Sequence, residues 1–278
     1  MSIRRRSRIP VAILKYLIIG LGLIFFLFPI YWLVTSSFKM DVDIFSLPTK
    51  LFIFKPTLEN FQKVFTDTNI PKLTINSLIT ASINVVLSLS IGTIAAYGIS
   101  RYKVGGQKLL FWFLSLRMIP PIVVAIPLFL TAARLRLVDT RIILPIMYLL
   151  LNIPFVVWMM KSFIDEIPIS VEESAFLDGC SVFAVIRRIV IPMIKPGLVA
   201  TGVFCFIFSW NEFLLAMIFT RMRASTLPIG ISGFIAVEQI FWGPLTASAT
   251  VAALPPIVLA WVFQRYMVRG LTFGAVKM

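Results

Sequence analysis

Long apolar runs alternate with short polar segments along most of the chain. A helix of about 20 apolar residues crosses the hydrocarbon core of a bilayer. Runs of this kind cover residues 11–34, 75–100, 109–131, 142–160, 197–220 and 244–263. Several contain proline, which membrane helices tolerate when neighbouring groups satisfy the freed carbonyls. The pattern therefore predicts an all-α membrane protein, in which residues 1–278 form a single domain with six transmembrane helices.

The composition supports this class and excludes others. Of the 278 residues, 59% are hydrophobic and only 14% are charged, which is too few charges to cover a soluble domain. The chain has no histidine and two cysteines, so the commonest general base and metal ligand is missing. We therefore expect no catalytic residue, no metal site and no cofactor in this chain. The net charge of +14 comes from basic residues that flank the apolar runs, as membrane orientation requires, so no nucleic-acid partner is expected.

The basic residues also predict the orientation. Arg4, Arg5, Arg6 and Arg8 precede the first apolar run, and such a cluster favours a cytoplasmic N-terminus. The run is too long for the apolar part of a signal peptide, and no small-residue cleavage site follows it. With six spans, the tail at residues 264–278 is cytoplasmic as well.

The polar segment at 165–196, between the fourth and fifth spans, predicts a cytoplasmic helix pair. Ser170 and Glu173 have the spacing of a capping box, so a first helix should begin directly after Ser170. Gly179 should end that helix in a left-handed turn. Ser181 can then cap a second helix, which would end at the next proline. On local physics alone, this pair is equally well explained as an interfacial connector between two spans.

This segment resembles a known family. Glu172-Glu173-Ser174-Ala175, then Gly179, then Ile189-Val190-Ile191-Pro192 are similar to the "EAA" loop of ABC importer permeases. Ser174 replaces an alanine of that motif and Ile191 replaces a leucine, while the Glu, Gly, Ile and Pro spacing is kept. Further positions resemble the shorter permease of the maltose-type carbohydrate branch: Asn76-Ser77, Leu137-Val138-Asp139-Thr140, Trp210-Asn211-Glu212-Phe213, Gln264-Arg265-Tyr266 and Gly274-Ala275-Val276-Lys277.

The resemblance implies an ATP-driven importer in a bacterial or archaeal inner membrane. The expected partners are a second permease, two ATPase subunits that carry ATP and magnesium, and an extracytoplasmic solute-binding protein. The chain has no phosphate-binding loop of its own. By resemblance, the contacts with the ATPase would involve Glu172, Glu173, Ser174, Ala175, Asp178, Gly179, Ile189 and Pro192. The tail, with Gly270, Gly274 and Lys277, would reach the ATPase in an extended path.

Polar and aromatic side chains inside the spans are candidates for the substrate pathway. A charge inside a bilayer is costly and is usually paired or faces a polar path. Sugars are bound through hydrogen bonds and aromatic faces, so the expected substrate is a sugar, a related glycoside or a polyol. The candidates are Arg117, Asn152, Trp210, Asn211 and Glu212, with Asn84 as a further hydrogen-bonding residue. A purely structural alternative is that Arg117 and Glu212 form an ion pair, and that the aromatic side chains serve packing or contact lipid.

Two other classes of protein compete with the importer permease. The first is a secondary transporter or channel that works alone. Such proteins usually need intramembrane carboxylates, and only Glu212 lies clearly inside a predicted span. The second is an integral-membrane enzyme, which the missing histidine and the lack of paired carboxylates in the spans disfavour.

Overall fold

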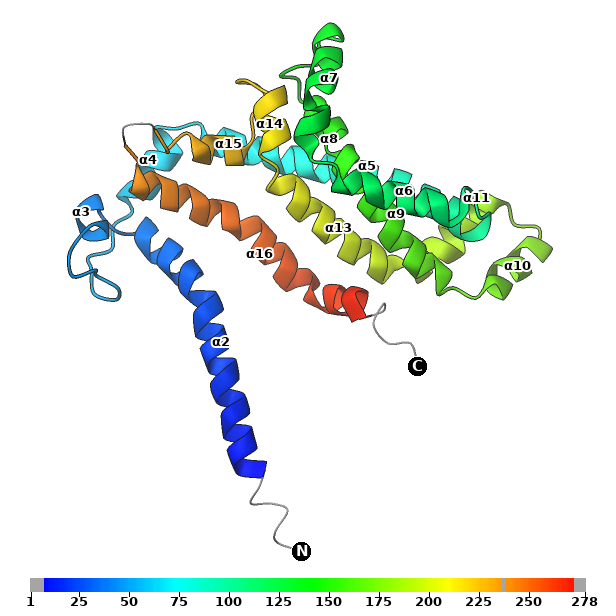
Figure 1. Ribbon diagram of the computed structural model, residues 1–278, viewed down its shortest axis with the longest axis horizontal. Coiled ribbons are helices and arrows are strands. Elements are labelled where there is room, and N and C mark those ends of the chain that lie inside the picture. The colour runs from blue at the N-terminus through cyan, green and yellow to red at the C-terminus, as the bar shows by residue number, and fades with distance from the viewer. Residues whose placement is uncertain (1–7, 237–238, 273–278) are drawn as a thin grey trace, which may run out of the picture. The chain divides into compact units, whose positions relative to one another are not determined.

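The computed structural model describes residues 8–236 and 239–272. In these residues the regular structure is helical and no strand is present, so the predicted all-α class is confirmed (Figure 1). The cluster Arg4, Arg5 and Arg6 lies outside the described residues. The chain divides into two compact units: residues 1–70 with 231–252, and residues 71–230 with 253–278.

The first unit contains α2 (Arg8–Ser37), α3 (Asp41–Ile44), α4 (Glu59–Thr66) and the start of α16 (Trp242–Thr272). Its packing centres on the end of α2. The Lys39 ammonium is buried over the rings of Trp32 and Phe54, at 4.6 and 4.9 Å. Burial lowers the pKa of Lys39, and the nearby Asp43 carboxylate offsets part of that effect. The amide of Asn60 donates to the carbonyls of Ser37 and Lys39, which fixes α4 beneath this turn.

The second unit is a helical bundle around α9 (Leu149–Asp165). Helix α9 packs against α6 (Gly106–Met118) and α13 (Lys195–Trp210). Two glycines allow close approach. A Cβ at Gly92 of α5 (Ile70–Arg101) would lie 2.5 Å from Val156, and one at Gly197 would lie 2.4 Å from a Phe163 ring carbon. Small residues at such crossings are how membrane helices pack without a hydrophobic driving force.

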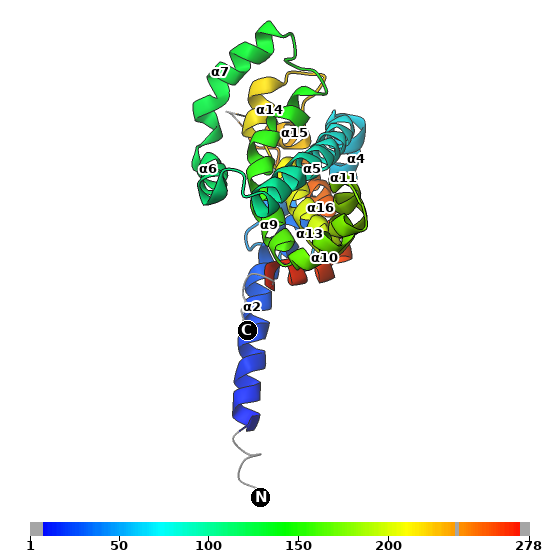
Figure 2. The same ribbon diagram turned by 90° about the vertical axis from the view of Figure 1, so that its right-hand side faces the viewer.

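The two ends of α5 lie beside different loops (Figures 1 and 2). Toward its N-terminal end are α14 (Leu214–Phe219) and α15 (Leu227–Ser232), and near its middle are α7 (Pro121–Arg134) and α8 (Ile143–Met147), where Asn84 donates to the Pro145 carbonyl. Toward its C-terminal end are α10 (Ile169–Leu177), α11 (Val182–Val185), the π-helical segment η1 (Ile186–Val190) and α12 (Ile191–Met193). Residues 223–227, from the segment predicted to be external, and α10, from the segment predicted to be internal, are therefore attached at opposite ends of α5.

The apolar runs form spans of two kinds. Among the residues that the structure describes, three helices are long and apolar enough to cross a membrane, at Leu14–Ser37, Ile70–Arg101 and Trp242–Met267. Two bent pairs raise the number to five: α6 with α7, at 89°, and Val182–Met193 with α13, at 78°. The predicted third span at 109–131 is bent where α6 ends and α7 begins, at Pro120 and Pro121. The count of six spans stays a prediction.

Two further predicted spans are divided. The run at 142–160 forms α8 and α9, which meet at Tyr148. The run at 197–220 forms α13 and α14, with residues 211–213 between them. The carbonyls that such breaks release need other donors or a polar environment. The interruptions therefore mark where this bundle departs from simple membrane-crossing helices.

Candidate functional site

The segment at 165–196 folds into the predicted helix–turn–helix. Helix α10 is followed by a turn in which Gly179 has φ +84°, a conformation that glycine adopts at no steric cost. The hydroxyl of Ser181 accepts a hydrogen bond from the N–H of Ala184 at 3.3 Å and so caps α11. The predicted turn and the predicted second cap are both confirmed.

Two local details of that prediction are wrong. Helix α10 begins at Ile169, directly after Pro168, whose φ of −58° already suits a helix. Ser170 therefore lies inside the first turn, no capping box forms, and its carbonyl accepts from the Ser174 hydroxyl at 2.9 Å. The second helix does not end at Pro192 either, since that residue lies within α12.

The two adjacent glutamates have different environments. Glu172 is 2% exposed, and its carboxylate accepts from the Tyr97 hydroxyl and from Nε of Arg101, each at 2.7 Å. Nη2 of Arg101 also donates to the carbonyls of Ile164 and Ile167, at 2.8 and 2.9 Å. Glu172 thus fastens α10 to the C-terminal end of α5. Sequence reasoning assigned Glu172 to the ATPase contact and did not identify this pair.

Glu173 points the other way, into solvent. The exposed side chains of α10 and its C-terminal cap include two carboxylates and several apolar groups: Glu173, Ser174, Phe176, Leu177 and Asp178. Leu177 is 90% exposed and Phe183 is 71% exposed. Ala175 faces inward and packs with Val185 and Val190, while Ile189 is half-buried and Pro192 is exposed. The residues expected to contact the ATPase therefore divide into a set that faces outward and a set that packs the two helices together.

A second set of contacts ties the same segment to α5 and α9. The Ser100 hydroxyl donates to Asp165 at 2.5 Å, and the Lys161 ammonium pairs with the other oxygen of Asp165, also at 2.5 Å. The side chain of Glu166 is largely exposed, but part of its carboxyl group is shielded from water, and this desolvation raises its pKa. The beginning of the 165–196 segment is thus attached to α5 and α9 ahead of α10.

Asn152 lies in the interior of the bundle. Its amide donates to Oδ1 of Asn84 at 2.5 Å and to the Ser209 hydroxyl at 2.9 Å. Ser209 in turn donates to the same Asn84 oxygen at 3.1 Å, and all three side chains are buried. The network joins α5, α9 and α13. It gives Asn152 a structural role, and Ser209 is a member that sequence reasoning missed.

Arg117 and Glu212 do not form an ion pair. The Arg117 guanidinium lies over the rings of Phe155 and Phe208, at 4.7 and 4.6 Å. Glu212 accepts a hydrogen bond from the N–H of Leu215 at 2.8 Å, at the start of α14. The ion-pair alternative is therefore wrong, since aromatic faces stabilise the cation and a helix N-terminus stabilises the carboxylate.

The remaining pathway candidates lie at the break between α13 and α14. Trp210 is buried, and its ring stacks on Phe206 with centroids 5.7 Å apart. Asn211 is exposed, and its amide donates to the Ile207 carbonyl within the same helix at 2.9 Å. Within the described residues, no protein group donates a hydrogen bond to the amide oxygen of the exposed Asn211.

The opposite end of the bundle holds a second cluster of interactions, which sequence reasoning quoted as motif residues but gave no role. Asp139 accepts hydrogen bonds from four successive backbone N–H groups at residues 221–224. Asn76 donates to the carbonyls of Arg223 and Ser225, at 3.0 and 2.9 Å. The Ser77 hydroxyl accepts from the N–H of Leu227 at 2.8 Å. This end is therefore also fastened to α5.

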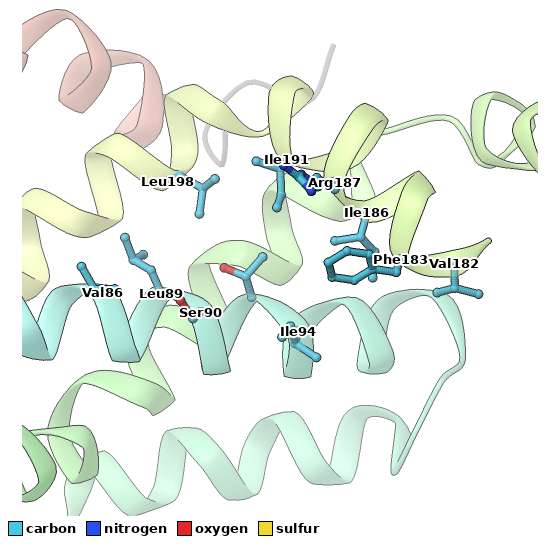
Figure 3. Close-up of a pocket in the computed structure, with 11 residues that line it drawn as sticks. Val86, Leu89, Ser90, Ile94, Val182, Phe183, Ile186, Arg187, Ile191 and Leu198 are labelled. Atoms are coloured by element: carbon cyan, nitrogen blue, oxygen red, sulfur yellow. The ribbon is translucent and has the colours of Figure 1, made fainter. Parts of the chain in front are cut away.

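A groove of about 850 Å³ lies between α5, the 182–191 helix and α13 (Figure 3). Its walls are almost entirely apolar, with Phe183, Leu89 and Leu198 among them, and Arg187 and two hydroxyl groups are the polar exceptions. A sugar needs many hydrogen-bonding partners, so this groove does not have the chemistry of a sugar site.

The tail differs from the expectation of an extended path. Helix α16 continues to Thr272, so Gly270 lies in a helix. Gly274 and Lys277 lie outside the described residues.

Known proteins resemble this chain over almost its whole length. Residues 88–273 match the family described as binding-protein-dependent transport system inner membrane component. The chain is 39% identical to the probable ABC transporter permease protein y4oR of Sinorhizobium fredii, with 91% of each chain covered. It is 34% identical to the trehalose/maltose transport system permease protein MalG of Thermococcus litoralis, covering 95% of this chain and 98% of MalG.

A further relative and a solved structure are also similar to this chain. The trehalose transport system permease protein SugB of Mycobacterium tuberculosis is 33% identical, with 96% of each chain covered. The fold matches a chain of a bacterial ABC transporter involved in the import of the acidic polysaccharide alginate, with a TM-score of 0.78 and 21% identity, over 94% of this chain and 98% of that one. The resemblance to ABC importer permeases is thereby confirmed, and the chain belongs to the inner-membrane permease subunits of binding-protein-dependent ABC importers.

Proposed function

We propose that this permease imports a sugar, a related glycoside or a polyol as one half of a membrane heterodimer. Relatives named for maltose, trehalose and diacetylchitobiose transport support the substrate class. The partners are a second permease, two ATPase subunits that bind ATP and magnesium, and an extracytoplasmic binding protein that delivers the substrate. Both termini lie in the cytoplasm, and the tail contacts the ATPase.

The observation that carries the proposal is the exposed helix–turn–helix. Its exposed side chains include Glu173 and Asp178 with the apolar Phe176 and Leu177. An exposed apolar surface with charges at its edge is typical of a protein-binding site. The turn at Gly179 sets the angle between the two helices, and Glu172 fixes α10 on the bundle. Closure of an ATPase dimer bound here would move α10 as a unit.

The substrate pathway in this proposal runs along the face where the helices break. Asn211, at the break between α13 and α14, supplies a free amide oxygen. Trp210 and Asn152 hold the adjoining helix in position from inside the bundle. Glu212 and Arg117 shape the same region through a helix cap and aromatic contacts. The second permease supplies the opposite wall of the pathway.

The test is reconstitution of the four-component system in vesicles. Uptake of a radiolabelled disaccharide should require ATP on the ATPase side and binding protein on the other side. Hydrolysis should rise when loaded binding protein is added. Uptake that continues without the ATPase and follows an ion gradient would support a secondary transporter instead. That outcome is disfavoured because Glu212, which lies inside a predicted span, already caps a helix.

A further inference from the structure

Helix α5 is fastened at its C-terminal end by a buried ion pair. The side chains of Arg101 and Glu172 are 10% and 3% exposed, and they meet at 2.7 Å. Arg101 also donates to the carbonyls of Ile164 and Ile167 and to the Ser100 hydroxyl, so its guanidinium contacts both α10 and the chain leading into it. Tyr97, one turn earlier on α5, holds the second carboxylate oxygen. This end of α5 therefore moves with α10.

The same helix is fastened at its other end to a different segment. Asn76 and Ser77 hold residues 223–227 through three hydrogen bonds of 2.8 to 3.0 Å, and all are made with backbone groups. Asp139 holds the beginning of the same segment through its backbone N–H groups. Residues 221–227 are thus attached both to α5 and to the loop between α7 and α8.

Between these attachments α5 is one continuous helix. From Ser77 to Arg101 the helix rises about 36 Å, which is more than the thickness of a hydrocarbon core. It is packed along the way, with Gly92 against Val156 and Asn84 bonded to Asn152. The other route from the coupling segment, through α12 and α13, contains a 78° bend and then the break at residues 211–213. A displacement along α5 meets no such bend.

We infer that α5 is the mechanical link between the ATPase-facing helix pair and the 221–227 segment on the opposite side of the membrane. In this arrangement Glu172 does not contact the ATPase. It is a positioning residue that acts through Arg101, so that movement of α10 pulls α5 and α5 moves the loop that closes the far end of the pathway. This inference rests on the proposed function, since it needs an ATPase that moves α10.

The ion pair is suited to this task because removal of either partner destabilises the protein. Removal of one partner leaves a buried charge without its counter-ion. Arg101 holds four acceptors with a planar fork, and a lysine in its place supplies a single point charge that cannot reach them all. Glutamine at position 172 keeps the shape and one acceptor but loses the charge. Comparison of the conservative variants with the alanine variants therefore distinguishes the effect of losing the charge from the effect of losing the packing.

The experiment uses the complete reconstituted complex and measures three quantities: ATPase content, sugar taken up per ATP hydrolysed, and backbone hydrogen exchange at 165–181 and 221–227 with and without ATP. In the wild type, ATP should change exchange in both segments. In Glu172→Ala and Arg101→Ala, the ATPase should remain bound and exchange at 165–181 should still respond. The response at 221–227 should be lost, and uptake per ATP should fall by about tenfold.

Further variants keep the test decisive. Glu172→Gln and Arg101→Lys should lie between wild type and alanine. The reversed pair, Arg101→Glu with Glu172→Arg, should recover part of the uptake ratio lost in either single reversal. Glu166→Ala, which removes an exposed carboxylate of the same segment, is the matched control and should behave as wild type. If Glu172→Ala does not assemble, Tyr97→Phe removes one hydrogen bond from the same carboxylate and should lower the uptake ratio about two- to threefold.

The possible failures are distinguishable. A wild-type ratio and a normal 221–227 response in Glu172→Ala would overturn the link through α5. So would loss of the ATPase from Glu172→Ala while Tyr97→Phe transports normally, because that result makes Glu172 a direct contact. If the wild-type complex shows no hydrolysis stimulated by the binding protein, the proposed function fails, whatever the variants do.

Discussion

The carboxylate of Asp139 is held by the backbone of Arg223, whose N–H group lies 3.0 Å from one oxygen and 3.1 Å from the other. The N–H groups of Arg221, Met222 and Ala224 complete the set, at 3.0 to 3.3 Å. Asp139 itself has φ +61°, a strained backbone for a residue with a side chain. Four donors on one carboxylate offset that strain and organise the loop after α14.

The first prediction concerns the charge on Asp139. Asp139→Asn should lower the free energy of unfolding by about 2 kcal/mol, because an amide oxygen replaces an acceptor that satisfied four N–H groups. Thermal unfolding of the purified permease complex in detergent measures the change. Asp41→Asn, at an exposed carboxylate that forms no ion pair, is the control. Equal melting temperatures for the two variants would contradict the role of this cluster.

The same cluster predicts a dependence on pH. Partial burial opposes the charge on Asp139, but the four N–H donors together outweigh burial and lower the pKa of its carboxyl. A carboxyl with a lowered pKa stabilises the fold above its unfolded pKa, near 3.8, and loses this contribution as pH falls toward the folded value. The stability difference between wild type and Asp139→Asn should therefore be constant from pH 7 to about pH 5. It should shrink below about pH 4.

The second prediction separates Asn152 from Asn211. Asn152→Ala removes the amide that bridges Asn84 and Ser209 inside the bundle. It should lower the free energy of unfolding by about 1 kcal/mol, the scale of interhelical hydrogen bonds in membranes. Asn211→Ala removes an exposed amide and should leave stability unchanged while raising the KM for sugar uptake. Loss of stability in Asn211→Ala with normal uptake would reverse the two assignments.

The fold class and the turn of the 165–196 segment were predictable from the sequence. Long apolar runs indicate helices that are buried in lipid. Gly179 and Ser181 indicate the turn and the helix cap, because glycine favours left-handed turns and a serine hydroxyl accepts from a free helix N–H group. The breaks within the runs were harder to predict. Proline is tolerated in membrane helices, so Pro120-Pro121 alone does not distinguish a kink from the 89° bend that is observed.

The location of the candidate site was predictable from the sequence. Which of its residues face the bundle and which face solvent was not. Glu172 and Glu173 are neighbours in one helix, and which of them faces the bundle depends on where the helix begins. The capping-box spacing favoured a start after Ser170, whereas Pro168 starts the helix earlier. One usable signal was present: Tyr97 and Arg101 are four residues apart and therefore share one face at the end of α5.

The third prediction follows from the failed ion pair. Because Arg117 lies against Phe155 and Phe208, reversing its charge should destabilise the complex, and adding Glu212→Arg should not restore it. Glu212→Gln should be tolerated, since its side-chain oxygen can still accept from the Leu215 N–H. Yield of the assembled complex and its melting temperature are the measurements. Recovery in the double reversal would show that the two charges interact after all.

The fourth prediction tests the turn of the coupling segment. At Gly179, φ is +84° and a Cβ would meet no atom within 4 Å. The cost of a substitution is therefore conformational and not steric, about 1 kcal/mol for most residues and more for a β-branched one. Gly179→Val should change the angle between α10 and α11, so that the exposed surface no longer fits the ATPase.

Gly179→Asn is the matched comparison, because asparagine adopts left-handed conformations more readily than valine. It should keep most of the ATPase in the purified complex and most of the hydrolysis stimulated by the binding protein, while Gly179→Val should lose both. Glu173→Ala, which leaves the turn intact and removes an exposed charge, should weaken the ATPase contact without unfolding the segment. Membrane insertion and pairing with the second permease should survive in all three variants, because Gly179 and Glu173 lie outside the bundle interior. Wild-type stimulation in Gly179→Val would mean that the angle between the two helices does not matter for coupling, and the segment would then be a connector between spans.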